Sequence, residues 1–498
     1  MSVLRSLLKE TVLYGMSYSL VRVLHFVIMT PYLTSVFKDE KAYFSLQTEI
    51  YFLIALMVGI LSFRMETAYF RFVSDDQFKK SIYPTASRMI LSACVLFSIF
   101  SIAFRRQIGE WLSYPDLGNV LIPAFLIIVL DAMIGLPFAR LRFEKQARKY
   151  ALIKVSSVLL TILLTVLLIE YRHLVQPWVK LSQDAHLKVF CILLANVLGS
   201  ASSYALLIPE IRHTFDPPDR KLYLKLFHYT WPLVFVTIAY TINQFGGISF
   251  LKYLMPGTAL ENLKQSADYS AVLRLAVIMN IFVTAFNYAA EPFFFRNATA
   301  KDRVEIYSKT SLYFIIASSI LYLIVCLFRD IPALLLNQNF RGSLSLLSIL
   351  LISNILVGLS SNFSTWYKLS DRTFIAAWIS LISLLITAVL SVWLIPLYGT
   401  TATAWILLVC NLFITVVSYL IGNKYMSQSY PLMRMSGYLL AAVGISILTD
   451  YFYSSISLSA LMKYFINISI LLLYTGICYR LEFSNHARKS RKEFHPEA

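Results

Sequence analysis

Charged side chains inside apolar segments are the residues of this sequence whose chemistry is most telling. The segment SYSLVRVLHFVIMTPYL carries Arg22 near its middle and His25 one helical turn later. The segment SFRMETAYFRF carries Arg64 and Glu66. A charged group at the centre of a bilayer costs at least about 2.5–3.5 kcal/mol, so such groups normally face a bundle interior or a watery cavity. These residues therefore predict a polar site within a membrane.

Two interpretations of these charges stay open at the level of sequence. In one, Glu66 neutralises Arg22 across a helix pair. In the other, Arg22 and Arg64 line a cavity and bind an anion, because guanidinium groups pair with phosphates through two parallel hydrogen bonds. By the rise per residue of a helix, both arginines lie roughly 12–16 Å from the cytoplasmic end of their segments. One carboxylate cannot neutralise both guanidiniums, which favours the anion site.

Further polar residues recur at helical spacing in other apolar segments. Such stripes either form hydrogen bonds between helices or line a cavity. The candidate substrate-binding residues, besides the two arginines, are His25, Gln244, Arg274, Asn280 and Asn287. The candidates for coupling or for structural ion pairs are Glu66, Asp131 and Glu291.

The composition identifies the segments that must hold these residues. The chain has 498 residues, of which 58% are hydrophobic and 14% are charged, and its mean hydropathy is +0.66. Soluble domains are about 45–50% apolar and about 25% charged. The apolar residues come in runs of about 20, the length that a helix needs to cross a bilayer. The sequence therefore predicts an all-α polytopic membrane protein.

We expect about fourteen transmembrane helices, joined by connections too short to form a soluble domain. Prolines such as Pro137 and Pro232 are expected to break several of the helices. The predicted spans are 11–37, 44–72, 82–104, 118–139, 150–170, 187–209, 228–251, 268–293, 309–328, 342–363, 374–396, 401–423, 433–453 and 458–479.

The formal net charge of +17 reports membrane topology. With the N-terminus in the cytoplasm, the cytoplasmic segments hold more than twice as many Lys and Arg residues as the opposite side. This bias is the positive-inside pattern, and it predicts that both termini are cytoplasmic. The charge therefore does not indicate a nucleic-acid partner.

Motifs of catalysis are missing from the sequence. It has no G-x-x-x-x-G-K-[ST] motif for nucleotide phosphates and no H-E-x-x-H motif. The seven histidines do not cluster, and the five cysteines lie in apolar runs without metal-ligand spacing. We therefore expect no enzyme, nucleotide, metal or other cofactor.

Four stretches carry a resemblance to a known family, and two of them, YTWPLVFVTIAYTINQFG (229–246) and NYAAEPFFF (287–295), add to the two described next. LPFARLRFEKQARKYALIKV (136–155) is similar to the loop between spans 4 and 5 of the polysaccharide-export proteins in the MOP (multidrug/oligosaccharidyl-lipid/polysaccharide) exporter superfamily. NFSTWYKLSDRTFIAAWISLISLLITAVLSVWLIPLYGTTATAWILL (362–408) resembles their C-terminal region more closely. The aromatic-Lys loop, the IPLYG sequence and the small-residue turn carry this likeness.

The resemblance implies a Wzx-type flippase in the bacterial inner membrane. Such a protein moves polyprenyl-pyrophosphate-linked oligosaccharides from the cytoplasmic to the periplasmic leaflet, for O-antigen, capsule or exopolysaccharide synthesis. Two six-helix lobes (1–210 and 211–425) would enclose a cationic cavity that works by alternating access. Two extra helices and a basic tail (426–498) would follow. The implied partners are the lipid-linked glycan, membrane lipids, a polysaccharide polymerase and chain-length proteins.

Three other functions remain as alternatives. A cation-coupled multidrug antiporter on the same fold would be expected to place carboxylates in its cavity. A lipid II flippase has the same number of spans and a cationic cavity, so the sequence separates it poorly. A membrane enzyme would need a long loop rich in Arg and His. The glycan, the oligomeric state and the coupling to H⁺, Na⁺ or membrane potential stay open.

Overall fold

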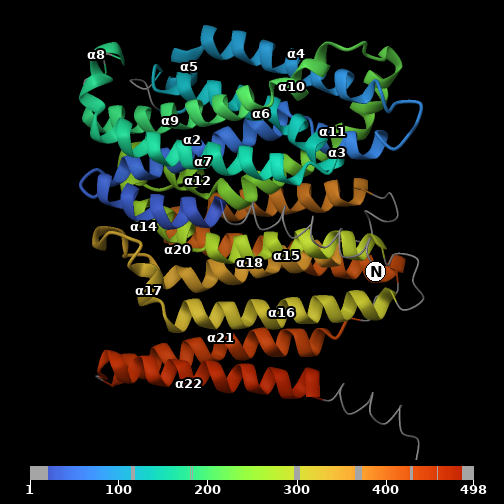
Figure 1. Ribbon diagram of the computed structural model, residues 1–498. Coiled ribbons are helices and arrows are strands. Elements are labelled where there is room, and N and C mark those ends of the chain that lie inside the picture. The colour runs from blue at the N-terminus through green and yellow to red at the C-terminus, as the bar shows by residue number, and fades with distance from the viewer. Residues whose placement is uncertain are drawn as a thin grey trace, which may run out of the picture.

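The protein is a bundle of helices that run roughly parallel to one another (Figure 1). The computed structural model describes residues 21–113, 118–179, 181, 183–296, 303–364, 373–426, 430–456 and 458–484. Its described part contains helices and turns and no strand. A helix satisfies its backbone hydrogen bonds internally, which apolar segments require where no water is present.

The first half of the described chain contains one unlabelled apolar helix, Val21–Val36, and a series of longer and shorter helices after it. These are α2 (Lys41–Leu61), α3 (Met65–Phe72), α4 (Ile82–Ala103), α5 (Arg105–Trp111), α6 (Leu121–Phe143), α7 (Ala147–Glu170), η2 (Arg172–Leu174), α8 (Gln176–Val179), α9 (Asp184–Leu206), α10 (Ile208–Ile211) and η3 (Arg212–Phe215).

The second half continues with the same alternation of long and short helices. These are α11 (Arg220–Phe245), α12 (Gly247–Leu254), α13 (Ala259–Gln265), α14 (Ala267–Leu275), α15 (Val277–Arg296), α16 (Arg303–Leu327), α17 (Asp330–Ala333), η4 (Gln338–Phe340), η5 (Leu344–Leu346), α18 (Leu347–Phe363), α20 (Thr373–Met426), α21 (Leu432–Ser455), α22 (Ala460–Tyr479) and η6 (Arg480–Ser484).

The helix count agrees with the sequence. Twelve helices of the described chain are long and apolar enough to span a bilayer, and Val21–Val36 is a shorter apolar helix. One of the twelve, α20, has a non-helical residue at Gly399. Thr387 Oγ1 and Cys410 Sγ, on either side of Gly399, lie 2.9 Å apart, so the two halves of α20 fold back on each other. Counted as two helices, α20 brings the total to the fourteen predicted spans.

The interruptions of the helices differ from the prediction. The prolines Pro137 and Pro232 lie inside α6 and α11, which continue through them. The predicted span 44–72 instead breaks at Phe63 and Arg64, which have left-handed backbone angles with φ of 47° and 52°. Membrane helices tolerate proline because neighbouring groups satisfy the freed backbone, so proline alone did not locate the breaks.

Two more predicted spans are divided. The span 228–251 changes from α11 to α12 at Gly246, and the span 268–293 changes from α14 to α15 at Ala276. A side chain at Gly247 would meet Thr403 Cγ2 at 2.7 Å. Glycine therefore allows α12 to pack closely against α20.

The helices pack in two groups. In one group, α6 lies against α2, α4 and α9, and α7 lies against α9. In the other group, α18 lies against α15, α16 and α20, and α11 also contacts α20. The helices α21 and α22 contact α16 and form the edge of the bundle (Figure 1). The domain boundaries at 210 and 425 stay a prediction.

The turn within α20 gives the first testable prediction. Gly399 has φ 53° and ψ −126°, a region that is sparsely populated by residues with a Cβ. We expect Gly399→Ala to lower the free energy of unfolding by about 1–3 kcal/mol, measured by thermal unfolding in detergent. Gly437→Ala is the matched control, since a Cβ there meets nothing within 4 Å. Equal stability of the two variants would contradict a strained turn at Gly399.

Candidate functional site

Glu66 pairs with Arg142, which lies outside the predicted span 118–139. Glu66 lies in the first turn of α3, directly after the break. Its Oε2 accepts a hydrogen bond from Nη2 of Arg142, near the end of α6, at 2.7 Å. A Cβ on Gly135 would lie 2.9 Å from Glu66 Oε1, so the glycine leaves room for the carboxylate. This geometry gives Glu66 a partner other than Arg22.

Lys154 of α7 brings a further cation to the same region. Its Nζ lies 4.1 Å from the centre of the Phe138 ring, a favourable position for a cation over an aromatic face. Lys154 also interacts electrostatically with Asp131 and with the Glu66–Arg142 pair. Asp131 of α6 accepts a hydrogen bond from Ser200 Oγ of α9 at 2.7 Å.

Arg22 connects this region to the second half of the chain. It lies within electrostatic range of Lys154, and its Nη1 donates to Asn280 Oδ1 of α15 at 3.2 Å. Two of the predicted site residues, Arg22 and Asn280, are thus brought together from positions 258 residues apart. His25, one turn beyond Arg22, is exposed and within electrostatic range of Arg274.

We call five of these residues the charge cluster: Arg22, Glu66, Asp131, Arg142 and Lys154. Three are basic and two are acidic. If Lys154 and Asp131 are both charged, the cluster carries one excess positive charge. If both are neutral, Arg22 and Arg142 still exceed Glu66 by one charge. The described cluster is therefore net cationic in either state.

Arg64 lies next to the charge cluster in sequence, at the N-cap position of α3. Its side chain is exposed. Within the described residues, its guanidinium makes no hydrogen bond or ion pair. The left-handed backbone at Arg64 is uncommon for a residue with a side chain, and such conformations concentrate at functional sites.

Of the other predicted residues in the second half, Gln244 lies in a buried hydrogen-bond network, and Asn287 and Glu291 lie in α15. Gln244 is buried, and its side-chain amide bonds to Asn354 at 3.3 Å and to Asn411 at 3.4 Å, so it joins three helices. Asn287 is half-buried in α15. Glu291 lies in the same helix, but its side chain falls outside the described part. The structure does not bring Gln244 into the charge cluster.

Arg274 lies in a separate contact between the two halves of the chain. Its guanidinium sits 4.2 Å from the centre of the Phe44 ring. Its Nη2 donates to Gln47 Oε1 at 3.2 Å and to Thr48 Oγ1 at 3.3 Å. The predicted site residue Arg274 therefore binds α14 to α2.

Two ion pairs strengthen this contact, which we call the α2 contact. Lys41 Nζ lies 2.5 Å from Asp268 Oδ1, and Lys252 Nζ lies 3.2 Å from Glu49 Oε2. Both members of the second pair are almost fully buried. The hydroxyl oxygens of Ser45 and Ser270 also lie 3.2 Å apart. The α2 contact thus joins α2 to α12 and α14.

Six of these charged residues were missed in the sequence: Lys41, Glu49, Arg142, Lys154, Lys252 and Asp268. Arg142 was placed in a cytoplasmic loop, although it lies within α6. Lys154, Glu49 and Lys252 lie in or beside predicted spans, and a search for every ionisable residue in those spans would have found them. Their partners, by contrast, come from other helices and have no signal in the local sequence.

Comparison with known proteins shows similarity in structure but not in sequence. No protein-family model matches the chain, and no curated protein sequence matches it. Several solved structures do align with it over most of their length.

An inward-closed structure described as lipid II flippase MurJ aligns with a TM-score of 0.64 at 14% identity, over 93% of this chain and 99% of that chain. An inward-facing multidrug resistance MATE family transporter of the MOP superfamily aligns with a TM-score of 0.54 at 15% identity, over 85% and 95%. A MATE crystal structure in a bent conformation aligns with a TM-score of 0.55 at 13% identity, over 87% of this chain and 95% of that chain. The chain therefore has the same fold as these solved structures.

Proposed function

We propose that this protein is a flippase for lipids that carry a glycan on a polyprenyl pyrophosphate. It would move them from the cytoplasmic to the periplasmic leaflet of a bacterial inner membrane, with both of its termini in the cytoplasm. The product would supply a polysaccharide polymerase and its chain-length proteins. The observation that carries the proposal is the net positive charge cluster at which Arg22 meets Asn280 between the two halves of the chain.

The chemistry of the headgroup fits this cluster. A pyrophosphate diester is an anion that must cross a region where water is scarce. Guanidinium groups bind phosphate oxygens through two parallel hydrogen bonds, and the attraction is stronger at low dielectric. The exposed guanidinium of Arg64, two residues before Glu66 in the chain, offers the donors for such a contact. Arg22 and Lys154 supply further positive charge.

Transport by alternating access requires the two halves to separate on one side and then on the other. The α2 contact lies at the end of α2 that the charge bias places outside. Its ion pairs and its hydrogen bonds hold α2 against α12 and α14. We propose that this contact closes the periplasmic side and opens to release the lipid. Asp131 is the proposed site of coupling to a proton or cation.

A lipid II flippase is the second candidate, supported by the structural likeness to MurJ. Its substrate would carry the same polyprenyl-pyrophosphate group, so the charge cluster would serve both functions. A drug antiporter for lipophilic cations is disfavoured, because a net positive cluster repels a cationic substrate.

The second testable prediction concerns the charge cluster and Arg64. The probe is undecaprenyl pyrophosphate, and undecaprenol is the uncharged control ligand. We expect Arg64→Ala and Arg22→Ala each to weaken pyrophosphate-lipid binding roughly 10- to 100-fold, since a lost charge-assisted hydrogen bond costs about 1.5–3 kcal/mol. The lysine variants should keep part of the affinity, because they retain the charge but not the two-pronged geometry. Native mass spectrometry of the purified chain measures both ligands.

Arg105→Ala is the matched control for these variants. Arg105 is half-buried on α5 and donates to the backbone of Ile102 in the preceding helix. Its loss should leave binding unchanged. If the arginine variants bind the pyrophosphate lipid as tightly as the original chain, or lose both ligands equally, the cluster is not the headgroup site.

The third prediction tests movement at the α2 contact. Ser45 and Ser270 are fully buried, with their oxygens 3.2 Å apart, close enough for a disulfide after substitution by cysteine. We expect oxidised Ser45→Cys/Ser270→Cys to lose more than 90% of its transport, and reduction to restore it. The readout is the exposure of a fluorescent polyprenyl-pyrophosphate lipid to an impermeant quencher in proteoliposomes.

A disulfide within one half of the chain provides the control. Thr387→Cys would face the native Cys410, whose sulfur lies 2.9 Å from the threonine oxygen. Both residues lie in α20, so this bond should leave transport intact. The single variant Ser270→Cys, oxidised under the same conditions, should also keep full transport and checks for nonspecific damage. Normal transport by the cross-linked double variant would refute separation at the α2 contact.

A further inference from the structure

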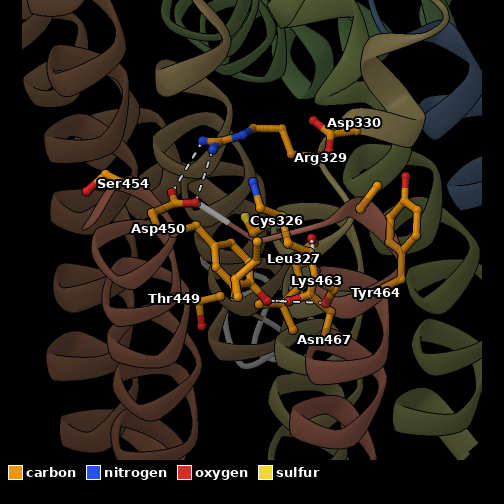
Figure 2. Close-up of a pocket in the computed structure, with 13 residues that line it drawn as sticks. Cys326, Leu327, Arg329, Asp330, Thr449, Asp450, Ser454, Lys463, Tyr464 and Asn467 are labelled. Carbon is orange, nitrogen blue, oxygen red and sulfur yellow. Dashed lines mark hydrogen bonds and ion pairs between the residues drawn. The ribbon is translucent and has the colours of Figure 1, made fainter. Parts of the chain in front are cut away.

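A polar pocket lies away from the charge cluster, where α16, α21 and α22 meet. It has a volume of about 490 Å³, within the roughly 300–1,000 Å³ range of small-molecule sites. Figure 2 shows Arg329 and Asp450 joined across this pocket, with Lys463 and Asn467 near its centre. We call it the α22 pocket. The residues used below are Arg329, Asp330, Asp450, Tyr453, Lys463 and Asn467.

Hydrogen bonds fix the walls of this pocket. The buried amide of Asn467 on α22 donates to the Leu327 carbonyl at the end of α16, at 2.7 Å. The same side chain accepts from the hydroxyl of Tyr453 on α21 at 2.7 Å. Arg329 and Asp450 form a two-pronged ion pair at 3.0 and 3.3 Å (Figure 2). The pocket is therefore preformed, and the charges of Arg329 and Asp450 already neutralise each other.

Two further charges in the pocket have no ionic partner in the described chain. The ammonium of Lys463 lies 5.3 Å from the centre of the Tyr453 ring and makes no hydrogen bond or ion pair with a described residue. The carboxylate of Asp330 is exposed and likewise unpaired within that part of the chain. The pocket thus presents one cation and one anion to a ligand, so a zwitterion complements it better than a simple anion.

The position of the pocket indicates where such a zwitterion comes from. The helices α21 and α22 form the edge of the bundle (Figure 1). Beside the pocket they expose large apolar side chains, including Leu448, Leu461 and Phe465. A ligand with a zwitterionic head and hydrocarbon chains could place its head in the pocket and its chains along this apolar face.

We propose that the α22 pocket binds the phosphoethanolamine headgroup of a bilayer phospholipid. Lys463 would contact the phosphate, and Asp330 would accept hydrogen bonds from the primary ammonium. The bound lipid would anchor α22 to the end of α16. This assignment rests on the membrane fold and does not depend on the proposed flippase activity.

The test uses the full chain in nanodiscs that contain equal amounts of phosphatidylethanolamine, phosphatidylglycerol and phosphatidylcholine with identical acyl chains. After extraction into detergent, native mass spectrometry measures the retained lipids. We expect at least fivefold enrichment of phosphatidylethanolamine. Lys463→Gln should abolish the enrichment. Asp330→Asn should remove the preference over phosphatidylglycerol, because the ammonium would lose the negative charge that attracts it.

Charge-matched controls lie at exposed positions outside the pocket. Lys264→Gln and Asp39→Asn remove the same charges and should leave the enrichment intact. Thermal unfolding identifies any variant that fails to fold, and Asp330→Asn, which changes an exposed side chain, keeps the proposal testable if Lys463→Gln is unstable.

A soluble competitor separates the two sources of the headgroup. Displacement of the bound phosphatidylethanolamine by millimolar phosphoethanolamine would support the site and show that the head alone is recognised. Binding of phosphoethanolamine with no retention of phosphatidylethanolamine would overturn the lipid assignment. Equal retention of the three lipids, or enrichment that survives both pocket substitutions, would overturn the proposal.

Discussion

The cost of placing a charge in hydrocarbon shapes the interior of this protein. A guanidinium or ammonium group there needs protein atoms to replace its lost water. Arg142 finds a carboxylate on another helix, Arg274 finds an aromatic face and two side-chain oxygens, and Arg22 finds an amide oxygen. Each contact joins segments that are distant in sequence. The charges thus specify which helices must lie side by side.

Breaks in the helices place several of these charges. The left-handed residues Phe63 and Arg64 separate α2 from α3, and Glu66 reaches α6 from the first turn after that break. Ala276 separates α14, which carries Arg274, from α15, which carries Asn280. Interrupted helices occur in transporters where their ends surround a binding site. Here the interruption lets one predicted span place Arg274 in the α2 contact and Asn280 against Arg22 of the charge cluster.

The buried pair of Glu49 and Lys252 bears on the proposed opening of the α2 contact. Removing one partner of a buried ion pair leaves an uncompensated charge, which costs several kcal/mol. If the α2 contact opens as proposed, both side chains become exposed to water, and hydration replaces their mutual attraction. A buried ion pair can therefore hold two halves in register while closed, yet separate when water enters.

The sequence alone determined the helical class, the number of spans and the short connections, because hydropathy and run length are local properties. It also identified Arg22, Arg64 and Asn280 as polar or charged residues within apolar segments, and therefore as candidates for a polar site in the membrane. The GTTATAW turn marked the position at which α20 reverses, since Gly399 adopts angles that favour glycine.

Only the tertiary structure decided the partners of these residues. It joined Glu66 to Arg142, drew Lys154 into the charge cluster and used Gln244 to connect buried helices. It also moved the helix breaks away from Pro137 and Pro232. The physical reason is that pairing and packing depend on the distance between helices in space, which the periodicity of a single helix does not contain.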